Sequence, residues 1–237
     1  MFEIISSNQR GRADFGWLQS QHSFSFGEYY NPARMGFSAL RVINDDEVAP
    51  GAGFHTHSHR NMEIISYVLE GTMAHRDSAG HQQVLPAGEF QLMSAGRGIS
   101  HSEFNASQTE RLKFLQIWLK PAETETAPSY QQKAFGQQSG LTEVITPDGR
   151  NGTLQLRQNA RLSQLLLATS ESEPLTLAAE RSYYLHVIAG DLQLSLPDGN
   201  QLLQAGDGIY LSAVDATVAA QASGTAVRAL WFDLPAA

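Results

Sequence analysis

The sequence contains no cysteine. Disulfide bonds, thiolate metal ligands and thiol nucleophiles are therefore excluded, and a metal ion would have to be bound by nitrogen and oxygen donors. Basic residues are also few, with 16 lysines and arginines against 24 aspartates and glutamates, which gives a formal net charge of -8. Because contacts to phosphate groups need clustered lysine and arginine, we expect no direct binding to nucleic acid.

Long apolar runs are absent as well. No run approaches the roughly 20 apolar residues that a membrane-spanning helix requires. The first residues, MFEIISSNQRGR, lack the apolar core and the small-residue cleavage site of a signal peptide. We therefore expect a cytoplasmic protein that does not bind membranes.

Most of the chain shows the composition of β-strands. Several segments are rich in β-branched, aromatic and leucine residues, for example 36–43 (GFSALRVI), 64–70 (IISYVLE) and 111–119 (RLKFLQIWL). Turn sequences separate them at short intervals, such as DSAG at 77–80, PAG at 86–88 and PDG at 147–149 and 197–199. Many short strands at this spacing predict an all-β sandwich or barrel.

The two halves of the chain resemble each other. In the first half, SYVLEG (66–71) precedes LPAGEFQLMSAG (85–96), and in the second, LHVIAG (185–190) precedes LQAGDGIYLSAV (203–214). Between the halves, residues 121–139 are polar and include two prolines. We predict two antiparallel β-barrels packed together, one in residues 1–125 and one in 140–237, with a linker at 126–139.

Two short pairs of residues in the first half have the composition of a metal site. His57 and His59 form one pair, and His101 and Glu103 form the other. Residues two apart on a strand point to the same face, so both pairs can converge on one point between neighbouring strands. Imidazole and carboxylate donors together suit one divalent iron, copper, nickel, manganese or zinc ion per chain.

Alternatives to this assignment remain open. A histidine-rich tract can be a solvated loop, and Glu63, four residues after His59, competes with Glu103 for the carboxylate position or orients a neighbouring histidine. His22, His75 and His81 have no partner at ligand spacing and are interpreted as surface or strand histidines. We expect His55 to be a bystander and His186 to be an ordinary strand histidine. Aligning the halves places Thr176, Ala178, Ala219 and Gln221 opposite the four proposed ligands, which predicts that the second barrel binds no metal.

Longer motifs carry a family resemblance. The segment GAGFHTHSHRNMEIISYVLEG (51–71) resembles the first motif of the cupin superfamily. Two others, HSFSFGEYYNP (22–32) and LMSAGRGISHSEF (92–104), resemble the pirin family of bicupins more specifically. The likeness covers essentially the whole chain and is strongest in residues 20–120. It implies two jelly-roll domains and a metal ion in the N-terminal one only, bound by His57, His59, His101 and Glu103.

The resemblance also implies an activity. Some pirin-like proteins resemble quercetinases, which cleave a flavonol ring with dioxygen and release carbon monoxide. In that reaction the metal lowers the pKa of the 3-hydroxyl group and Glu103 is the expected general base. Because eukaryotic pirins are linked to transcriptional co-regulation, the alternative is a regulatory or redox-sensing module that binds another protein without turnover. A third hypothesis is another cupin reaction, such as isomerisation or decarboxylation.

Overall fold

The computed structural model describes residues 2–212 and 214–237, and almost all regular structure in them is β-strand. The two helical segments of this part of the chain are short 3-10 turns, Ser7–Gln9 and Arg150–Gly152. No helix among the described residues has the length and apolar character to cross a membrane. The prediction of an all-β protein is confirmed.

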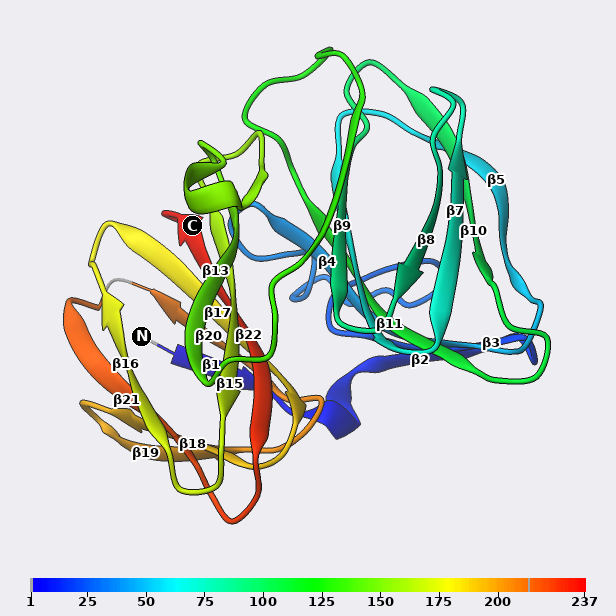
Figure 1. Ribbon diagram of the computed structural model, residues 1–237. Coiled ribbons are helices and arrows are strands. Elements are labelled where there is room, and N and C mark those ends of the chain that lie inside the picture. Colours follow the sequence, from blue (N-terminus) through cyan, green and yellow to red (C-terminus); the bar gives the residue numbers. More distant parts are fainter. Residues whose placement is uncertain (1, 213) are drawn as a thin grey trace. The chain divides into compact units, whose positions relative to one another are not determined.

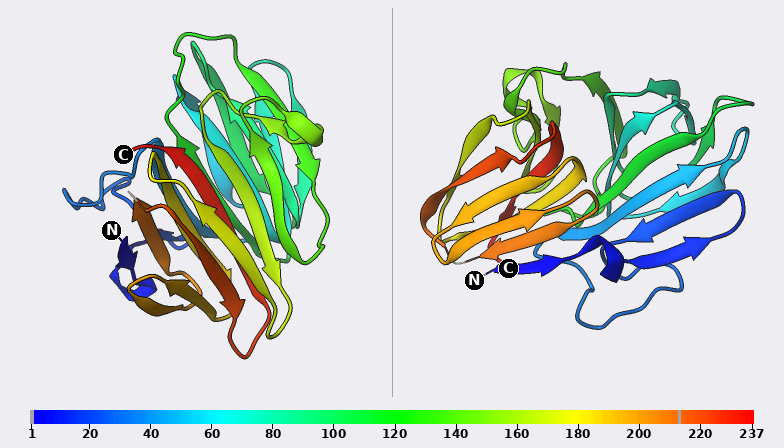
Figure 2. Two further views of the ribbon diagram at one scale, coloured as in Figure 1. Left: turned by 90° about the vertical axis from the view of Figure 1, so that its left-hand side faces the viewer. Right: turned by 90° about the horizontal axis from the view of Figure 1, so that it is seen from below.

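The described chain divides into two compact units. The first contains Gly11–Gly136 and Leu156–Gln158, and the second contains the N-terminal residues up to Arg10, Gln137–Gln155 and Asn159–Ala237. In each unit a seven-stranded sheet faces a four-stranded sheet (Figure 1, Figure 2). The two sheets of a unit remain separate in their hydrogen bonding, so each unit is an open two-layered jelly roll and not a closed barrel.

The first unit has antiparallel pairing throughout. Its large sheet has the order β12-β9-β6-β11-β4-β3-β2 and its small sheet the order β5-β10-β7-β8. The strands of the large sheet are β2 (Gly11–Asp14), β3 (Leu18–His22), β4 (Leu40–Val48), β6 (Glu63–Glu70), β9 (Glu89–Ser94), β11 (Leu112–Leu119) and β12 (Ser129–Ala134). Those of the small sheet are β5 (Gly53–His59), β7 (Thr72–Asp77), β8 (Gln82–Pro86) and β10 (Ile99–Asn105).

The second unit repeats this arrangement, with β1-β20-β17-β22-β15-β13-β14 as its large sheet and β16-β21-β18-β19 as its small sheet. The strands of the large sheet are β1 (Phe2–Ile5), β13 (Gly140–Thr146), β14 (Leu154–Gln155), β15 (Arg161–Leu167), β17 (Arg181–Ala189), β20 (Gly208–Ser212) and β22 (Val227–Pro235). Those of the small sheet are β16 (Ser172–Leu177), β18 (Leu192–Leu196), β19 (Gly199–Leu203) and β21 (Ala216–Ala222).

Glycines at equivalent positions support the duplication. Gly71 and Gly190 each follow a long central strand and have the same φ of +81°, which disfavours residues with a side chain. A Cβ at Gly71 would lie 2.6 Å from the carbonyl oxygen of Arg111, and one at Gly190 would overlap the carbonyl of Ala226. Both positions therefore require glycine because a backbone segment passes directly beside them.

The grouping of the chain differs in two places from the expected boundaries of 1–125, 126–139 and 140–237. Strand β1 pairs with β20 of the second unit, from Phe2 opposite Leu211 to Ile5 opposite Gly208, and Figure 2 shows it beside the orange strands. Strand β12 lies inside the expected linker and pairs with β9, from Ser129 opposite Ser94 to Ala134 opposite Glu89. Both are edge strands held by backbone pairing, which local composition does not reveal.

The interior of the first unit is apolar at one end and polar further along. Val48, Val68 and Phe114 belong to an apolar cluster between the two sheets. Side chains two or four residues away on the same strands share that inner face. On these strands the side chains are Asn44, Gln116 and Ser66, and Ser66 is paired in turn with Gln91 of β9. All four side chains are buried and form a row across the sheet.

In the second unit the equivalent interior is apolar. Leu185, Ile209 and Trp231 stand where the first unit has Ser66, Gln91 and Gln116, and all three belong to its hydrophobic core. Burying neutral polar side chains costs free energy unless they are hydrogen-bonded. The first unit therefore keeps a polar interior that the fold itself does not need.

Candidate metal centre

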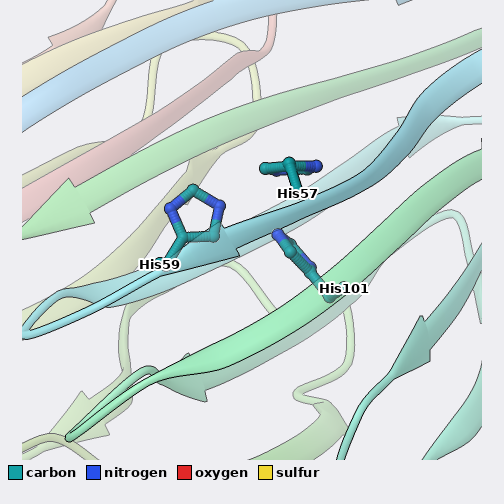
Figure 3. Close-up of side chains that lie close together, drawn as sticks. All are labelled: His57, His59 and His101. Atoms are coloured by element: carbon teal, nitrogen blue, oxygen red, sulfur yellow. The ribbon is translucent and has the colours of Figure 1, made fainter.

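Three of the predicted ligands converge inside the first unit. His57 and His59 lie on β5, and His101 lies on β10 directly opposite His57. The ring centroids of these histidines are 4.6 to 4.9 Å apart, and one ring nitrogen from each lies within 4.8 Å of the others. Figure 3 shows the three rings close together, with His57 and His59 on one strand and His101 rising from the neighbouring strand. Spacing two on adjacent strands thus brings them together as predicted.

The environment keeps the imidazoles of His59 and His101 uncharged. Burial, together with the neighbouring His57 and His75, lowers the pKa of His101 to about 3. Burial and the same kind of repulsion from His101 and His57 lower the pKa of His59 to about 4. At neutral pH both rings are therefore neutral and present a lone pair, which is the form that binds a metal ion.

One ring is also oriented by its own strand. The Nδ1–H group of His57 donates a hydrogen bond to the carbonyl oxygen of His55 at 2.7 Å. This bond fixes the tautomer and leaves the lone pair on Nε2 for a ligand. The side chain of His55 is exposed and packs against Phe104 at 5.2 Å, so its ring stays outside the cluster as predicted.

The donor set fits a metal ion. Both ring nitrogens of His101 are buried and have no hydrogen-bond partner among the described residues. An unsatisfied buried polar group costs about 1–3 kcal/mol, and a bound cation removes that cost for one nitrogen. Neutral imidazoles and a nearby carboxylate are typical donors for divalent first-row metals.

Glu103, the fourth predicted ligand, is buried two residues along β10 from His101. Its Oε1 accepts hydrogen bonds from Ser66 Oγ at 2.9 Å and from Gln91 Nε2 at 3.3 Å. Both bonds use the same oxygen, so they fix the carboxylate without using Oε2. Within 4.8 Å, Glu103 groups with His101 and His75, whereas His57 and His59 group with His101. His101 therefore belongs to two overlapping sets.

Glu63, the competing carboxylate, lies on the other face of its strand. Ser66 and Val68 of β6 point into the unit, so Glu63 has the opposite parity. Its Oε2 accepts hydrogen bonds from Ser94 Oγ at 2.8 Å and from the backbone N–H of Arg157 at 3.2 Å. The expected orientation of a histidine by Glu63 is not seen, because the turn after His59 breaks the parity between the two strands.

His75, which the sequence predicted to be a surface or strand histidine, and Asp77, which it did not single out, lie beside the cluster. His75 of β7 is directly opposite Glu103, and its side chain is 0% exposed. Its Nε2 lies 3.3 Å from Oδ2 of Asp77, which is 2.8 Å from Nδ1 of the half-buried His81. The prediction of a surface or ordinary strand position is therefore incomplete for His75. Its spacing of two from Asp77, as in the two predicted pairs, was the available signal.

Aromatic side chains border the histidines. Trp118 meets His59 edge to face at 5.0 Å and Phe26 at 5.3 Å. Tyr130, from the unexpected strand β12, lies against His75 at 4.8 Å. A surface pocket of about 360 Å³ includes His59 in its lining, together with Ser58, Arg60, Ser78, Gly98, Ile99 and Ser100.

In the second unit, the described residues at the positions of the four proposed ligands are apolar. Strand pairing makes Leu175, Leu177, Val218 and Ala220 the equivalents of His57, His59, His101 and Glu103, and all four belong to its hydrophobic core. The expected equivalents Thr176 and Gln221 are exposed and Ala178 and Ala219 also lie outside that core, one position away. The alignment was therefore displaced by one residue, and the four residues that strand pairing places at these positions are apolar.

The remaining buried histidines have other surroundings. His22 of β3 pairs with Asn44, with 2.8 Å between Nδ1 and Oδ1. His186 of β17 is buried 6.4 Å from the ring of Tyr184. Neither belongs to a group of three potential metal ligands in the described part of the chain.

Known proteins are similar to this chain in both sequence and fold. The profile of the family described as Pirin matches residues 5–119, and that of the quercetinase C-terminal cupin domain matches residues 143–234. A protein named quercetin 2,3-dioxygenase from Escherichia coli (strain K12) is 48% identical over 195 residues, which is 82% of this chain and 84% of that protein. Pirin-like protein YhaK from the same organism is 34% identical over 99% of this chain and 100% of its own length.

Solved structures agree with these matches. The crystal structure of the bacterial pirin YhhW from Escherichia coli in complex with nickel(II) has a TM-score of 0.94 and 43% identity, covering 100% of both chains. Quercetin 2,3-dioxygenase from Acinetobacter baumannii has a TM-score of 0.77 at 18% identity, which supports the two-cupin fold alone. With two jelly-roll units, matches to both domains and high identity along most of its length, this chain belongs to the pirin family of bicupins.

Proposed function

We propose that the chain is a metal-dependent dioxygenase that cleaves the ring of quercetin-like flavonols with dioxygen and releases carbon monoxide. The observation that carries this proposal is the group of three histidines beside a buried, oriented carboxylate in the polar interior of one unit. The relative named quercetin 2,3-dioxygenase, 48% identical over most of the chain, supports the choice of reaction.

The proposed ligands of the ion are His57, His59, His101 and Glu103. The ion is iron, copper, nickel, manganese or zinc, one per chain. Bound there, it supplies Lewis acidity that makes a coordinating hydroxyl group easier to deprotonate. The chain contributes donors that need not lose a proton first, because burial already keeps His59 and His101 neutral at pH 7.

Glu103 is the proposed acceptor of the proton from the 3-hydroxyl group. A general base must be held within hydrogen-bond reach of the proton that it removes. Ser66 and Gln91 hold the carboxylate by Oε1, which fixes the direction of Oε2. Apolar residues replace Ser66 and Gln91 in the second unit, which fits a role in this site and not in the fold.

The aromatic border suits a planar substrate. Trp118 flanks His59 and packs against Phe26, and Tyr130 flanks His75. Aromatic rings pack against one another in stacked or edge-to-face geometries, each contact contributing about 0.5–1.5 kcal/mol beyond the area buried. These walls bind the ring system and exclude water from the carboxylate.

The test is turnover with defined metals. The protein is stripped of metal, loaded in turn with each of the five ions, and assayed under air for quercetin consumption and carbon monoxide release. We expect turnover with at least one ion and none in the stripped protein. Loaded protein that consumes no quercetin with any ion would contradict the proposal and favour the regulatory module without turnover.

A further inference from the structure

The two overlapping sets of potential ligands are the basis of a further inference. One contains His57, His59 and His101, and the other contains His75, His101 and Glu103. We propose that the second set is an inner position for the metal ion, which makes His75 an additional metal-binding side chain. This inference rests on the proposed metal centre and extends it by one donor.

The backbone places His75 within reach. Strands β7 and β10 pair in a register that sets His75 opposite Glu103 and Asp77 opposite His101. The ring centroids of His75 and His101 are 5.4 Å apart. One donor atom from each of His75, His101 and Glu103 lies within 4.8 Å of the other two, and all three residues are buried.

The hydrogen bonding of His75 gives it the form of a metal ligand. Asp77 is an acceptor in this arrangement, since its Oδ1 also takes the backbone N–H groups of Ala79 and His81. The Nε2 of His75 therefore carries the proton and donates it to Oδ2 of Asp77 at 3.3 Å. A metal-binding histidine typically donates its second ring N–H to a carboxylate in this way.

This bond leaves a lone pair in the interior. In the neutral tautomer with the proton on Nε2, the Nδ1 of His75 is an acceptor, and this atom is buried without a hydrogen-bond partner among the described residues. The neighbouring groups also offer donor atoms, since both ring nitrogens of His101 lack a hydrogen-bond partner among the described residues and Oε2 of Glu103 is not used by Ser66 or Gln91. Three lone-pair donors gathered in a buried place are stabilised by a cation.

Other contacts keep the inner set in place. Ser66 and Gln91 hold Glu103 on the side of His75. The ring of Tyr130 lies against both His75 at 4.8 Å and His81 at 5.2 Å, which restricts rotation of the imidazole. The donors of the inner position are therefore oriented before an ion arrives.

The second unit provides a comparison within the chain. Counting from Gly71 and Gly190, Leu194 and Leu196 are the equivalents of His75 and Asp77, and both leucines belong to its apolar core. His75 and Asp77 are thus replaced together with all four proposed ligands. A purely structural role on β7 would not require them to change as one group.

The experiment replaces His57 and His59, the two donors that belong only to the first set, and tests whether the protein still binds copper. In the apo protein of the double variant His57→Ala/His59→Ala, Cu(II) affinity is measured by competition with a chelator. Nitrogen donors are counted from the hyperfine pattern in electron paramagnetic resonance. We expect one bound copper with two nitrogen donors, from His75 and His101.

Adding His75→Leu to this background should reduce the count to one nitrogen. It should weaken binding by more than about 100-fold, the upper range for residues that only orient a ligand. His75→Gln, which retains a polar side chain, should also lose one nitrogen while keeping the far-ultraviolet circular dichroism of the parent. Adding His55→Ala, an exposed histidine outside both sets, should change neither affinity nor count.

The inference is overturned if the double variant binds no copper, or if its nitrogen count is unchanged by both substitutions at His75. The second result would restrict His75 to orienting Glu103. Copper binding by the wild-type protein, measured in parallel, separates the two proposals. If the wild type binds copper and the double variant does not, only the inner position fails, and if the wild type binds none, the metal centre itself fails.

Discussion

His57 and His101 are paired directly across strands β5 and β10, with 4.6 Å between their ring centroids. They are separated by more than forty residues in the sequence, so the pairing depends on the register of the small sheet. A register shift of one residue would turn one of the two rings to the other face of the sheet. The geometry of the site is therefore determined by strand pairing.

Substituting either histidine should weaken metal binding. We expect His57→Ala and His101→Ala to retain little metal once unbound ions have been removed by dialysis, because each removes a proposed donor, and copper held by the inner position of a His57 variant is bound more weakly than in the wild type. Thr176→Ala and Gln221→Ala, exposed positions on β16 and β21 of the second unit, should retain the wild-type content. Elemental analysis of the four purified variants after equal loading is the measurement. Equal metal in all four would place the site elsewhere.

The two carboxylates should have separate effects. Glu103→Gln keeps an amide oxygen that can still coordinate weakly, but a neutral amide cannot accept the substrate's proton. We expect turnover of quercetin to fall by about 10²–10⁴-fold at matched metal content. Glu63→Gln should stay near wild-type turnover, because Glu63 faces away from the cluster and contacts Ser94 and Arg157. An inactive Glu63→Gln with an active Glu103→Gln would reverse the assignment.

The sequence predicted the ligand pairs because each lies within one strand, where a spacing of two fixes a common face. The duplicated glycines likewise marked the ends of equivalent strands. Both signals come from residues that are close together in the sequence, and the structure shows the same strands and the same glycine positions. His57, His59 and His101 could therefore be brought together before the fold was known.

Features that depend on pairing between distant strands could not be predicted. Strand β12 is polar because it lies at an edge, so 129–134 showed no alternating pattern. The displacement by one residue in the second unit arose because the pairs were aligned through flanking motifs and not through strand register. His75 was missed because its neighbour Glu103 is opposite it on another strand.

The residues that hold Glu103 should affect turnover more than metal content. Ser66→Ala removes a 2.9 Å hydrogen bond to Oε1 and leaves only the longer bond from Gln91. We expect a fall in kcat of about 10–100-fold, typical of a residue that orients a functional group. The KM for quercetin and the metal content should change little. A variant with lower metal content and unchanged kcat per bound ion would contradict this role.

The stability of the metal-free protein should decrease in mild acid because of the buried histidines. In the folded chain the pKa of His101 is about 3 and that of His59 about 4, against 6.5 for an unperturbed histidine. Below pH 6.5 these two histidines become protonated in the unfolded state but remain neutral in the folded state. This contribution to stability is therefore complete above pH 6.5 and is lost as the pH falls towards 4.

Replacing one of these histidines should weaken the pH dependence. At pH 5, the loss from His101 alone is on the order of 2 kcal/mol, from 1.5 pH units at 1.36 kcal/mol each. His101→Val carries the residue found at the equivalent position 218 of the second unit and cannot be protonated. With a chelator present, its Tm should fall less between pH 7 and pH 5 than that of the wild type, whereas exposed His55→Ala should follow the wild type. Equal decreases in all three proteins would show that protonation of the buried cluster does not control acid stability.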